Sequence, residues 1–312
     1  MLGSNPNPPV DDVANRNGTG LQNLRCGFNS HRRLSLFREE RKHKMKKNVL
    51  ITGAASGIGY QLAKKFLLEG HTVFMTDIDN VALEKAFERM LGAMLEVKHP
   101  GIPYWYRMNV NCVEDIATVL ENSNYIGGVD ILVNNAGIAC NKEMVETTDY
   151  DWVKLLNVNL VGPIRLINAF FPMLQKKQGH IVNVASGQAY FRLPGWGAYS
   201  TTKVALGAMS ELLAFELSKY NVKVTTVYPF MVDTPFYKGI VGDTFVSKMA
   251  MKLVPYYSNT PEQVADKIFK AVMKGKKIEY VNPINYLGIA VRAFPPVASA
   301  FTYIANKLFT RR

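Results

Sequence analysis

The chain has 312 residues, and its composition of 48% hydrophobic, 20% charged and 11% aromatic residues excludes a disordered, collagen-like or coiled-coil protein. Lys and Arg outnumber Asp and Glu by 37 to 25, but the excess lies at the two ends. Residues 1–47 carry ten basic and four acidic residues, and residues 267–312 carry nine basic residues and one acidic residue. Residues 48–266, in contrast, carry 18 basic and 20 acidic residues. A nearly neutral body argues against a nucleic-acid-binding fold, and the basic ends are predicted to meet an anionic surface.

The cysteines and the hydropathy pattern indicate the compartment. Cys26, Cys112 and Cys140 lack the spacing of a metal site or a redox pair, which favours thiols in a reducing compartment. No stretch reaches the ~18 apolar residues that span a bilayer, and the N-terminal region has no apolar run of a secretory signal. We therefore expect a cytoplasmic protein without a metal site, in peripheral contact with a membrane or lipid surface at most.

The N-terminal segment, residues 1–47, differs from the rest of the chain. It is rich in Asn, Pro, Gly and Arg and poor in apolar residues, so we expect a disordered arm with a short helix near 34–44. An Arg-rich arm also resembles a mitochondrial presequence, although its four acidic residues argue against that alternative.

From residue 48 onward, short apolar runs alternate with amphipathic stretches, which is the pattern of repeated strand–helix–strand units. The apolar runs are nearly continuous, as in parallel strands that helices cover on both faces. We expect strands at 48–52, 72–76, 104–108, 130–133, 180–184, 222–227 and 278–281. We expect helices at 57–69, 80–94, 113–122, 149–175, 198–219 and 261–274. One doubly wound α/β domain with a mainly parallel seven-stranded sheet is therefore predicted over 48–282.

A glycine-rich turn follows the first expected strand. The run TGAASGIG places Gly53, Gly57 and Gly59 between that strand and a helix, with Ser56 and Ile58 beside them. Glycines allow the backbone to turn sharply and approach a pyrophosphate, whose charge the helix N-terminus stabilises. The alternative is a glycine-rich turn that holds no ligand.

Asp77 ends the second expected strand, eighteen residues after the last of these glycines. A carboxylate at this point accepts hydrogen bonds from the adenosine ribose hydroxyls and repels a 2′-phosphate. No Arg or Lys occurs within 52–60 to neutralise such a phosphate, so NAD is favoured over NADP. The alternative role for Asp77 is a turn or a helix cap.

Further motifs occur in the order and at the spacings of the short-chain dehydrogenase/reductase family. Besides TGAASGIG they are Asn134-Asn135-Ala136-Gly137, Asn159 in NVNLVG, Ser186, and Tyr199 with Lys203. The chain over 48–282 therefore resembles that family, which implies a Rossmann domain and a nicotinamide cofactor. The resemblance assigns Asn159, Ser186, Tyr199 and Lys203 as catalytic residues.

The residue types agree with that assignment. Tyr199 and Lys203 lie four residues apart and share one face of a helix. Free tyrosine has a pKa of about 10, and a nearby ammonium or an oxidised nicotinamide favours its phenolate, so Tyr199 is predicted to be the general acid/base. Ser186, at a strand end, is placed to hydrogen-bond the substrate oxygen. By resemblance, Lys203 also holds the nicotinamide ribose and Asn159 supports a water chain to solvent.

The resemblance also completes the predicted cofactor contacts and shows two departures. It places Asn134 beside the adenosine ribose and the central strands. Asn109 stands where the family often has Asp against adenine, and Phe230 stands where the family usually has Gly. Beyond the glycine-rich turn and Asp77, the predicted contacts are Asn109, Val110, Asn135, Ala136, Gly137, Tyr199, Lys203, Pro229, Val232 and Thr234.

Apolar residues dominate the segments that would surround a substrate. Residues 234–260 form a long insertion rich in Phe, Tyr, Met and Val, which predicts a lid over a hydrophobic ligand. The loop after Ser186 adds Tyr190, Phe191, Leu193 and Trp196 to the predicted pocket wall. The alternative is that these side chains make core or oligomer contacts.

Residues 283–312 follow the predicted domain and contain two short apolar segments with basic residues between and after them. Amphipathic helices of this kind suit the interface of an anionic membrane. The alternative is a helix docked over the substrate pocket or a dimer seam. The ending, with the Pro229–Thr234 loop, resembles the membrane- and lipid-droplet-associated 17-beta-hydroxysteroid and retinol dehydrogenase branch.

We therefore expect an NAD-dependent oxidoreductase that interconverts a steroid-, retinoid- or lipid-like alcohol and its ketone or aldehyde, as a homodimer or homotetramer. A ketoacyl reductase of lipid synthesis is an alternative, and it would prefer NADP. A non-catalytic NAD-binding protein at a membrane surface is another alternative. The four catalytic residue types together argue against the last one.

Overall fold

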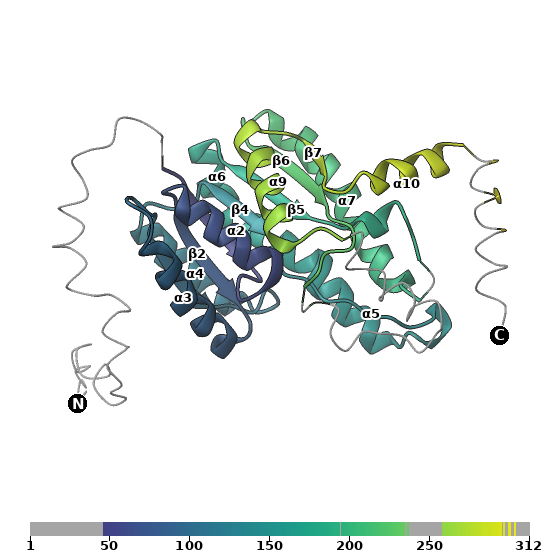
Figure 1. Cartoon of the computed structure of the whole chain (residues 1–312), viewed down its shortest axis with the longest axis horizontal. Coiled ribbons are helices and arrows are strands. Elements are labelled where there is room, and N and C mark those ends of the chain that lie inside the picture. Colours follow the sequence, from purple (N-terminus) through teal and green to yellow (C-terminus); the bar gives the residue numbers. More distant parts are fainter. Residues whose placement is uncertain are drawn as a thin grey trace, which may run out of the picture. The chain divides into compact units, whose positions relative to one another are not determined.

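A seven-stranded parallel sheet forms the centre of the structure, which is a computed structural model (Figure 1). The structure describes residues 46–193, 195–234, 236, 258–294 and the isolated positions 296, 299, 300 and 303. Residues 1–45 of the predicted arm and most of the predicted lid over 234–260 therefore lie outside the described residues.

The strands are β1 (Asn48–Thr52), β2 (Thr72–Asp77), β3 (Pro103–Arg107), β4 (Ile131–Asn134), β5 (His180–Val184), β6 (Lys223–Tyr228) and β7 (Ile278–Tyr280). They are arranged in the order β3-β2-β1-β4-β5-β6-β7, and each pairing is parallel. The chain thus starts in the middle of the sheet, moves to one edge and then returns to the other side of β1. Such a reversal leaves a crevice at the carboxyl ends of the strands, which is where α/β sheets bind ligands.

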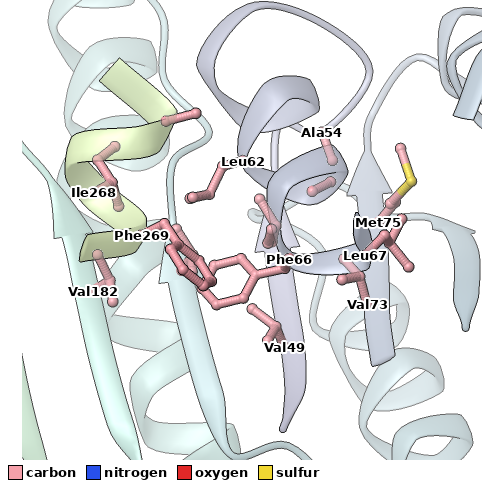
Figure 2. Close-up of a cluster of buried hydrophobic side chains, with 14 of the residues drawn as sticks. Val49, Ala54, Leu62, Phe66, Leu67, Val73, Met75, Val182, Ile268 and Phe269 are labelled. Carbon is pink, nitrogen blue, oxygen red and sulfur yellow. The ribbon is translucent and has the colours of Figure 1, made fainter. Parts of the chain in front are cut away.

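Two layers of helices cover the sheet. The helices α2 (Gly57–Leu68), α3 (Asn80–Met94) and α9 (Pro261–Lys274) bury apolar side chains against one face. The helices α4 (Val113–Tyr125), α6 (Gly162–Lys177) and α7 (Gly197–Ser218) cover the other. In the first layer, the rings of Phe66 and Phe269 meet edge to face at 5.0 Å between α2 and α9 (Figure 2). The predicted doubly wound fold is confirmed.

The helix expected over 149–175 is not continuous. It consists of α5 (Asp149–Leu156), the π-helical turn η4 (Asn157–Val161) and α6. Pro163 stands in the first turn of α6 and has no N–H with which to continue the α-helical hydrogen bonding. A single π turn inserted in a helix occurs often at functional sites, and this one contains Asn159.

Two 3-10 turns and the helix α10 are the remaining named elements of the described residues. The 3-10 turns η3 (Met144–Glu146) and η5 (Gly187–Ala189) follow β4 and β5, and α10 (Ile284–Ala293) follows β7. In the part of the chain that the structure describes, none of the helices is both long and apolar enough to span a bilayer. The second apolar segment predicted after 294 is described at four isolated positions only.

Candidate active site

The glycine-rich turn between β1 and α2 lies at the carboxyl edge of the sheet. Gly53 and Gly57 have φ angles of 66° and 53°, in the left-handed region that glycine adopts without strain. A Cβ atom on Gly59 would lie 2.1 Å from the carbonyl oxygen of Gly53, so α2 can begin this close to the turn only with glycine there. Ser56 is the N-cap residue, and Ile58 is in the first turn of α2. The turn presents a helix N-terminus to the crevice, as a pyrophosphate site requires.

Asp77 is the last residue of β2, and its carboxylate braces the same turn. One oxygen accepts a hydrogen bond from the N–H of Ala55 and the other accepts from the N–H of Asp79, both at 3.1 Å. Asp79, and not Asp77, caps α3, because its side chain accepts from the N–H of Ala82. Each carboxylate oxygen can accept a second bond, so Asp77 has capacity left for a ribose.

Asn109 and Val110 follow β3 at the predicted adenine position. The N–H of Asn109 donates to the Asp115 carboxylate at 2.8 Å, and its side-chain oxygen accepts from the N–H of Asn111 at 3.0 Å. Val110 is buried against Gly162, where a Cβ atom would lie 2.8 Å from the valine methyl. The loop is therefore fixed by its own hydrogen bonds and by the start of α6.

Two asparagines, one at the end of β4 and one directly after it, hold the crevice together. Asn135 donates from its side chain to the carbonyl of Thr52 at 2.9 Å. The N–H groups of Asn135 and Ala136 both donate to the Thr52 hydroxyl, at 3.0 and 2.9 Å. Asn134 is buried and donates to Asn183 of β5 at 2.8 Å. These residues lock the turn after β4 to the glycine-rich turn.

Tyr199 and Lys203 lie one turn apart on α7, as predicted. The ammonium of Lys203 is 5.9 Å from the centre of the Tyr199 ring and donates to the carbonyl of Val184 at 2.9 Å. Burial lowers the pKa of Lys203 to about 8, because the charged form loses its hydration. The side chain is still mainly protonated at neutral pH, and two of its three N–H groups remain for other acceptors. Gly137 lies beside it, since a Cβ atom added to this glycine would be 3.4 Å from the ammonium nitrogen.

Asn159 is fully buried in the π turn and fastens three segments together. Its side-chain oxygen accepts from the N–H of Ile138 at 2.9 Å, and its NH₂ donates to the Ile138 carbonyl at 2.8 Å. The second N–H donates to the Thr202 hydroxyl at 3.0 Å, and that hydroxyl donates to the carbonyl of Tyr199. Both donors of Asn159 are therefore occupied by the protein, and its role in a water chain stays a prediction.

Ser186 follows β5 and is tied to the helix of Tyr199 through Gln188. The Ser186 oxygen accepts from the N–H of Gln188 at 3.2 Å, which leaves its own O–H able to donate. The side-chain oxygen of Gln188 accepts from the hydroxyl of Ser200 and from the N–H of Leu193, both at 3.2 Å. Ser200 is adjacent to Tyr199, so Gln188 couples the positions of the two predicted catalytic residues.

The loop after β6 departs from the family pattern at Phe230. The Phe230 side chain is 4% exposed, and its ring packs edge to face on Phe191 at 5.7 Å. Pro229 accepts a hydrogen bond from the N–H of Gly187 at 2.6 Å. The next residue, Met231, has a φ angle of 47°, a left-handed conformation that costs free energy in a residue with a side chain. The chain turns here without the glycine that the family usually has.

Val232 and Thr234 close the other side of the crevice. Val232 is buried and forms an isolated parallel bridge with Asn259. The Thr234 methyl lies 3.2 Å from the Cβ position of Gly57, so this loop contacts the glycine-rich turn. The Thr234 hydroxyl makes a long hydrogen bond of 3.4 Å to the carbonyl of Val232.

Aromatic side chains surround the Tyr199 ring. Trp196 and Phe236 each lie with their ring centres 5.9 Å from that of Tyr199. Tyr190, in contrast, points toward the far edge of the sheet, where its hydroxyl is 3.3 Å from that of Tyr280. Burial raises the pKa of Tyr190 to about 12, so it does not ionise near neutral pH. Of the predicted pocket wall, Trp196 packs against Tyr199, the predicted general acid/base.

The family profile described as short chain dehydrogenase matches residues 47–243. The chain belongs to the short-chain dehydrogenase/reductase family. That match covers the glycine-rich turn, Asp77 and all four predicted catalytic residues.

Similar proteins include members of this family from several sources. The chain is 32% identical over 257 residues to "Dehydrogenase/reductase SDR family protein 7-like" of Anopheles gambiae, covering 80% of each chain. It is 35% identical over 188 residues to "3-oxoacyl-[acyl-carrier-protein] reductase FabG" of Thermotoga maritima, covering 60% of this chain and 74% of that protein. A short-chain dehydrogenase/reductase structure from Burkholderia phymatum in complex with NAD has a TM-score of 0.71 at 22% identity. That likeness covers 80% of this chain and 93% of the other, and shows the shared fold.

Three residues that position the family motifs were not predicted from the sequence. Gln188 joins the Ser186 loop to α7, and Thr202 joins Asn159 to the same helix. Asn285, at the start of α10, is fully buried behind the Ser186 loop. The signal for Thr202 was its place inside the Tyr199–Lys203 motif. Polar residues such as Gln188 and Asn285 carry no sequence pattern that distinguishes them from surface residues.

Proposed function

We propose that this chain is an NAD-dependent oxidoreductase that interconverts a hydrophobic alcohol and its ketone or aldehyde. The observation that carries the proposal is the buried Lys203 ammonium, 5.9 Å from the centre of the Tyr199 ring on the same face of α7. A positive charge in this position favours the phenolate of a tyrosine, and a tyrosine that gives and takes a proton is the general acid/base that such a reaction needs.

The residues present fit a nicotinamide dinucleotide. The positive φ angles at Gly53 and Gly57 and the absence of a side chain at Gly59 leave the backbone of the turn open to a pyrophosphate. The Asp77 carboxylate stands where ribose hydroxyls would donate and where a 2′-phosphate would be repelled. When bound, the nicotinamide supplies the hydride acceptor or donor. We therefore propose NAD as the preferred cofactor.

The four catalytic side chains then have separate tasks. Tyr199 takes the hydroxyl proton of an alcohol, or returns it to a ketone oxygen. Ser186 donates its O–H to the same substrate oxygen. The Ser186 oxygen already accepts a hydrogen bond from the backbone N–H of Gln188, which leaves the hydroxyl hydrogen for the substrate. Lys203 supplies positive charge and donates its two remaining N–H groups to the cofactor ribose. Asn159 fixes the loop after β4 against α7.

A hydrophobic substrate is favoured by the aromatic side chains around Tyr199. Trp196 and Phe236 pack beside the Tyr199 ring, each with its ring centre 5.9 Å away. An apolar enclosure favours apolar ligand surface and strengthens electrostatic interactions inside it.

A ketoacyl reductase is the second candidate. The observation that favours it is the 35% identity to the FabG protein of Thermotoga maritima over 60% of this chain. The two candidates share the chemistry of Tyr199 and differ in substrate and in cofactor preference.

The test is a panel of steroid, retinoid, fatty-alcohol and ketoacyl substrates, each assayed with NAD(H) and NADP(H). We expect turnover of an apolar alcohol or ketone with NAD(H), and Tyr199→Phe should lower kcat by more than about 100-fold because proton transfer is lost. Tyr220→Phe, on a tyrosine outside the site, is the matched control and should leave kcat unchanged. Activity in Tyr199→Phe within about tenfold of the wild type contradicts the mechanism, and a preference for NADPH with ketoacyl substrates selects the second candidate.

A further inference from the structure

Helix α10 begins directly behind the loop that carries Ser186. Asn285, in the first turn of α10, is fully buried and donates from its side chain to the carbonyl of Tyr228 at 2.8 Å. Tyr228 is the last residue of β6, which pairs with β5, and Ser186 follows β5. The hydrogen bond therefore anchors α10 at the end of the strand next to the catalytic serine.

Asn285 also occupies the space beside Gly187, the residue after Ser186. A Cβ atom on Gly187 would lie 2.4 Å from the side-chain oxygen of Asn285 and 2.5 Å from the Phe230 ring. The N–H of Gly187 donates to the carbonyl of Pro229 at 2.6 Å. The peptide after Ser186 is thus held between a main-chain acceptor and two buried side chains.

The side-chain oxygen of Asn285 accepts no hydrogen bond from the described residues, although it is buried. An unpaired buried oxygen costs free energy, and an apolar side chain of similar volume would pack in α10 without that cost. An asparagine amide, unlike an apolar side chain, has only one orientation here. Its NH₂ group donates to Tyr228, and its oxygen therefore faces Gly187. A Cα–H group is the weak donor that a carbonyl oxygen meets in such a contact.

A second contact holds the same face of α10 on the Ser186 loop. A Cβ atom on Gly288 would lie 3.2 Å from atoms of both Tyr190 and Phe191. Residues 285 and 288 are three apart, so they face the loop from successive turns of the helix. The helix therefore contacts the loop after Ser186 at two points, through Asn285 at Gly187 and through Gly288 at Phe191.

We propose that Asn285 is a positioning residue for Ser186, and that α10 belongs to the catalytic unit. The proposal rests on the proposed function, because Asn285 acts only through a Ser186 that contacts substrate. The match to the family profile ends at residue 243, so Asn285 lies outside it.

The test is a double-mutant cycle on Ser186→Ala and Asn285→Ala, measured with a substrate found in the panel. We expect Asn285→Ala to lower kcat by about tenfold and to change KM by less than about threefold, because the serine loses its orientation while the pocket remains. In the Ser186→Ala background the same change should have no further effect, since groups that act as a unit are not additive. An equal loss in both backgrounds, or no loss in the wild type, overturns the proposal.

Asn122→Ala is the control, because the Asn122 side chain donates to the carbonyl of Thr118 at 2.7 Å within α4, away from the site. It should leave kcat unchanged. If Asn285→Ala does not fold, Asn285→Leu keeps the volume and removes both polar atoms. Amide hydrogen exchange of the peptide over 180–193 provides a readout that needs no substrate. Faster exchange at 186–190 in the Asn285 variant supports the contact, and unchanged exchange overturns it, even if no panel substrate is turned over and the proposed function fails.

Discussion

His180, the first residue of β5, is a buried histidine that the proposed reaction does not use. Its Nε2 atom is 2.7 Å from the hydroxyl of Thr225 on β6. Burial and the nearby positive charge of Lys223 lower the pKa of His180 to about 4. The unfolded chain binds this proton below about pH 6.5, whereas the folded chain binds it only near pH 4, so acid favours unfolding.

We predict that His180→Gln makes the protein less sensitive to acid. The wild type should lose about 3 kcal/mol of unfolding free energy from this residue as the pH falls from 6.5 to 4. Glutamine can still pair with Thr225 but does not titrate in this range. Urea unfolding at pH 4, 5, 6 and 7 measures the difference between the two proteins. Parallel loss of stability in both would show that His180 does not titrate in this way.

Single residues explain which positions of the candidate site could be predicted from the sequence and which could not. Tyr199, Lys203 and Ser186 stand at fixed spacings in a motif, so their placement was predictable. Met231 takes the left-handed conformation that glycine usually provides, and no residue type at that position signals it. Asn285 was read as part of a tail, because burial of a polar residue depends on distant segments that local sequence does not encode.

The elements were predicted more accurately than their interruptions. The predicted bounds agree with the structure for four elements, β1, β5, α3 and α9. Buried parallel strands are visible in the sequence as apolar runs. Helix α9 has a capping box at Thr260 and a glycine at its end, which mark both of its bounds. The π turn at 157–161 was missed, since one extra residue in a turn does not disturb the pattern of apolar residues enough to be seen. Pro163 was the available signal.

Helix α7 presents an apolar surface on the side away from the site. Leu212 and Phe215 are 63% and 73% exposed and lie three residues apart, on one face of the helix. On α5, Tyr150 and Val153 are 73% and 57% exposed. Exposed apolar surface of this kind marks a protein contact, and we propose that a second copy of the chain covers it.

We predict that the double change Leu212→Ser and Phe215→Ser shifts the protein to a smaller assembly. Removing two large apolar side chains from a proposed interface removes the burial that holds the copies together. Light scattering after size-exclusion chromatography measures the mass. Leu95→Ser, on a residue that is 87% exposed beyond α3, is the control and should keep the wild-type mass. A wild type that is already monomeric contradicts the proposal.

For the whole molecule, the excess of basic residues lies at the two ends of the sequence. Residues 48–266 are nearly neutral, whereas 283–312 contain Arg292, Lys307, Arg311 and Arg312 and no acidic residue. Exposed aromatic side chains at Tyr286, Phe294 and Tyr303 accompany this charge. Aromatic and basic residues together suit an anionic lipid surface, and we propose that this segment makes such a contact.

We predict that removing residues 283–312 abolishes flotation with anionic vesicles and leaves the Kd for NAD unchanged within about threefold, because the tail lies outside the predicted cofactor contacts. Flotation with vesicles of neutral lipid is the control for electrostatic binding. Retained flotation of the shortened chain would locate the membrane contact elsewhere. Because the cut also removes Asn285, kcat should fall in the shortened chain.

The packing of α2 on α9 has a consequence for synthesis of the protein. Phe66 lies against Phe269, and Lys65 pairs with Asp266 at 3.4 Å, across two hundred residues of sequence. The cofactor turn and α2 leave the ribosome early, but α9 must follow before the apolar face of α2 is covered. A nascent chain therefore carries an open hydrophobic surface beside its nucleotide site during most of translation. Chaperones that bind apolar segments would act on this protein at the ribosome, before any cofactor can be held.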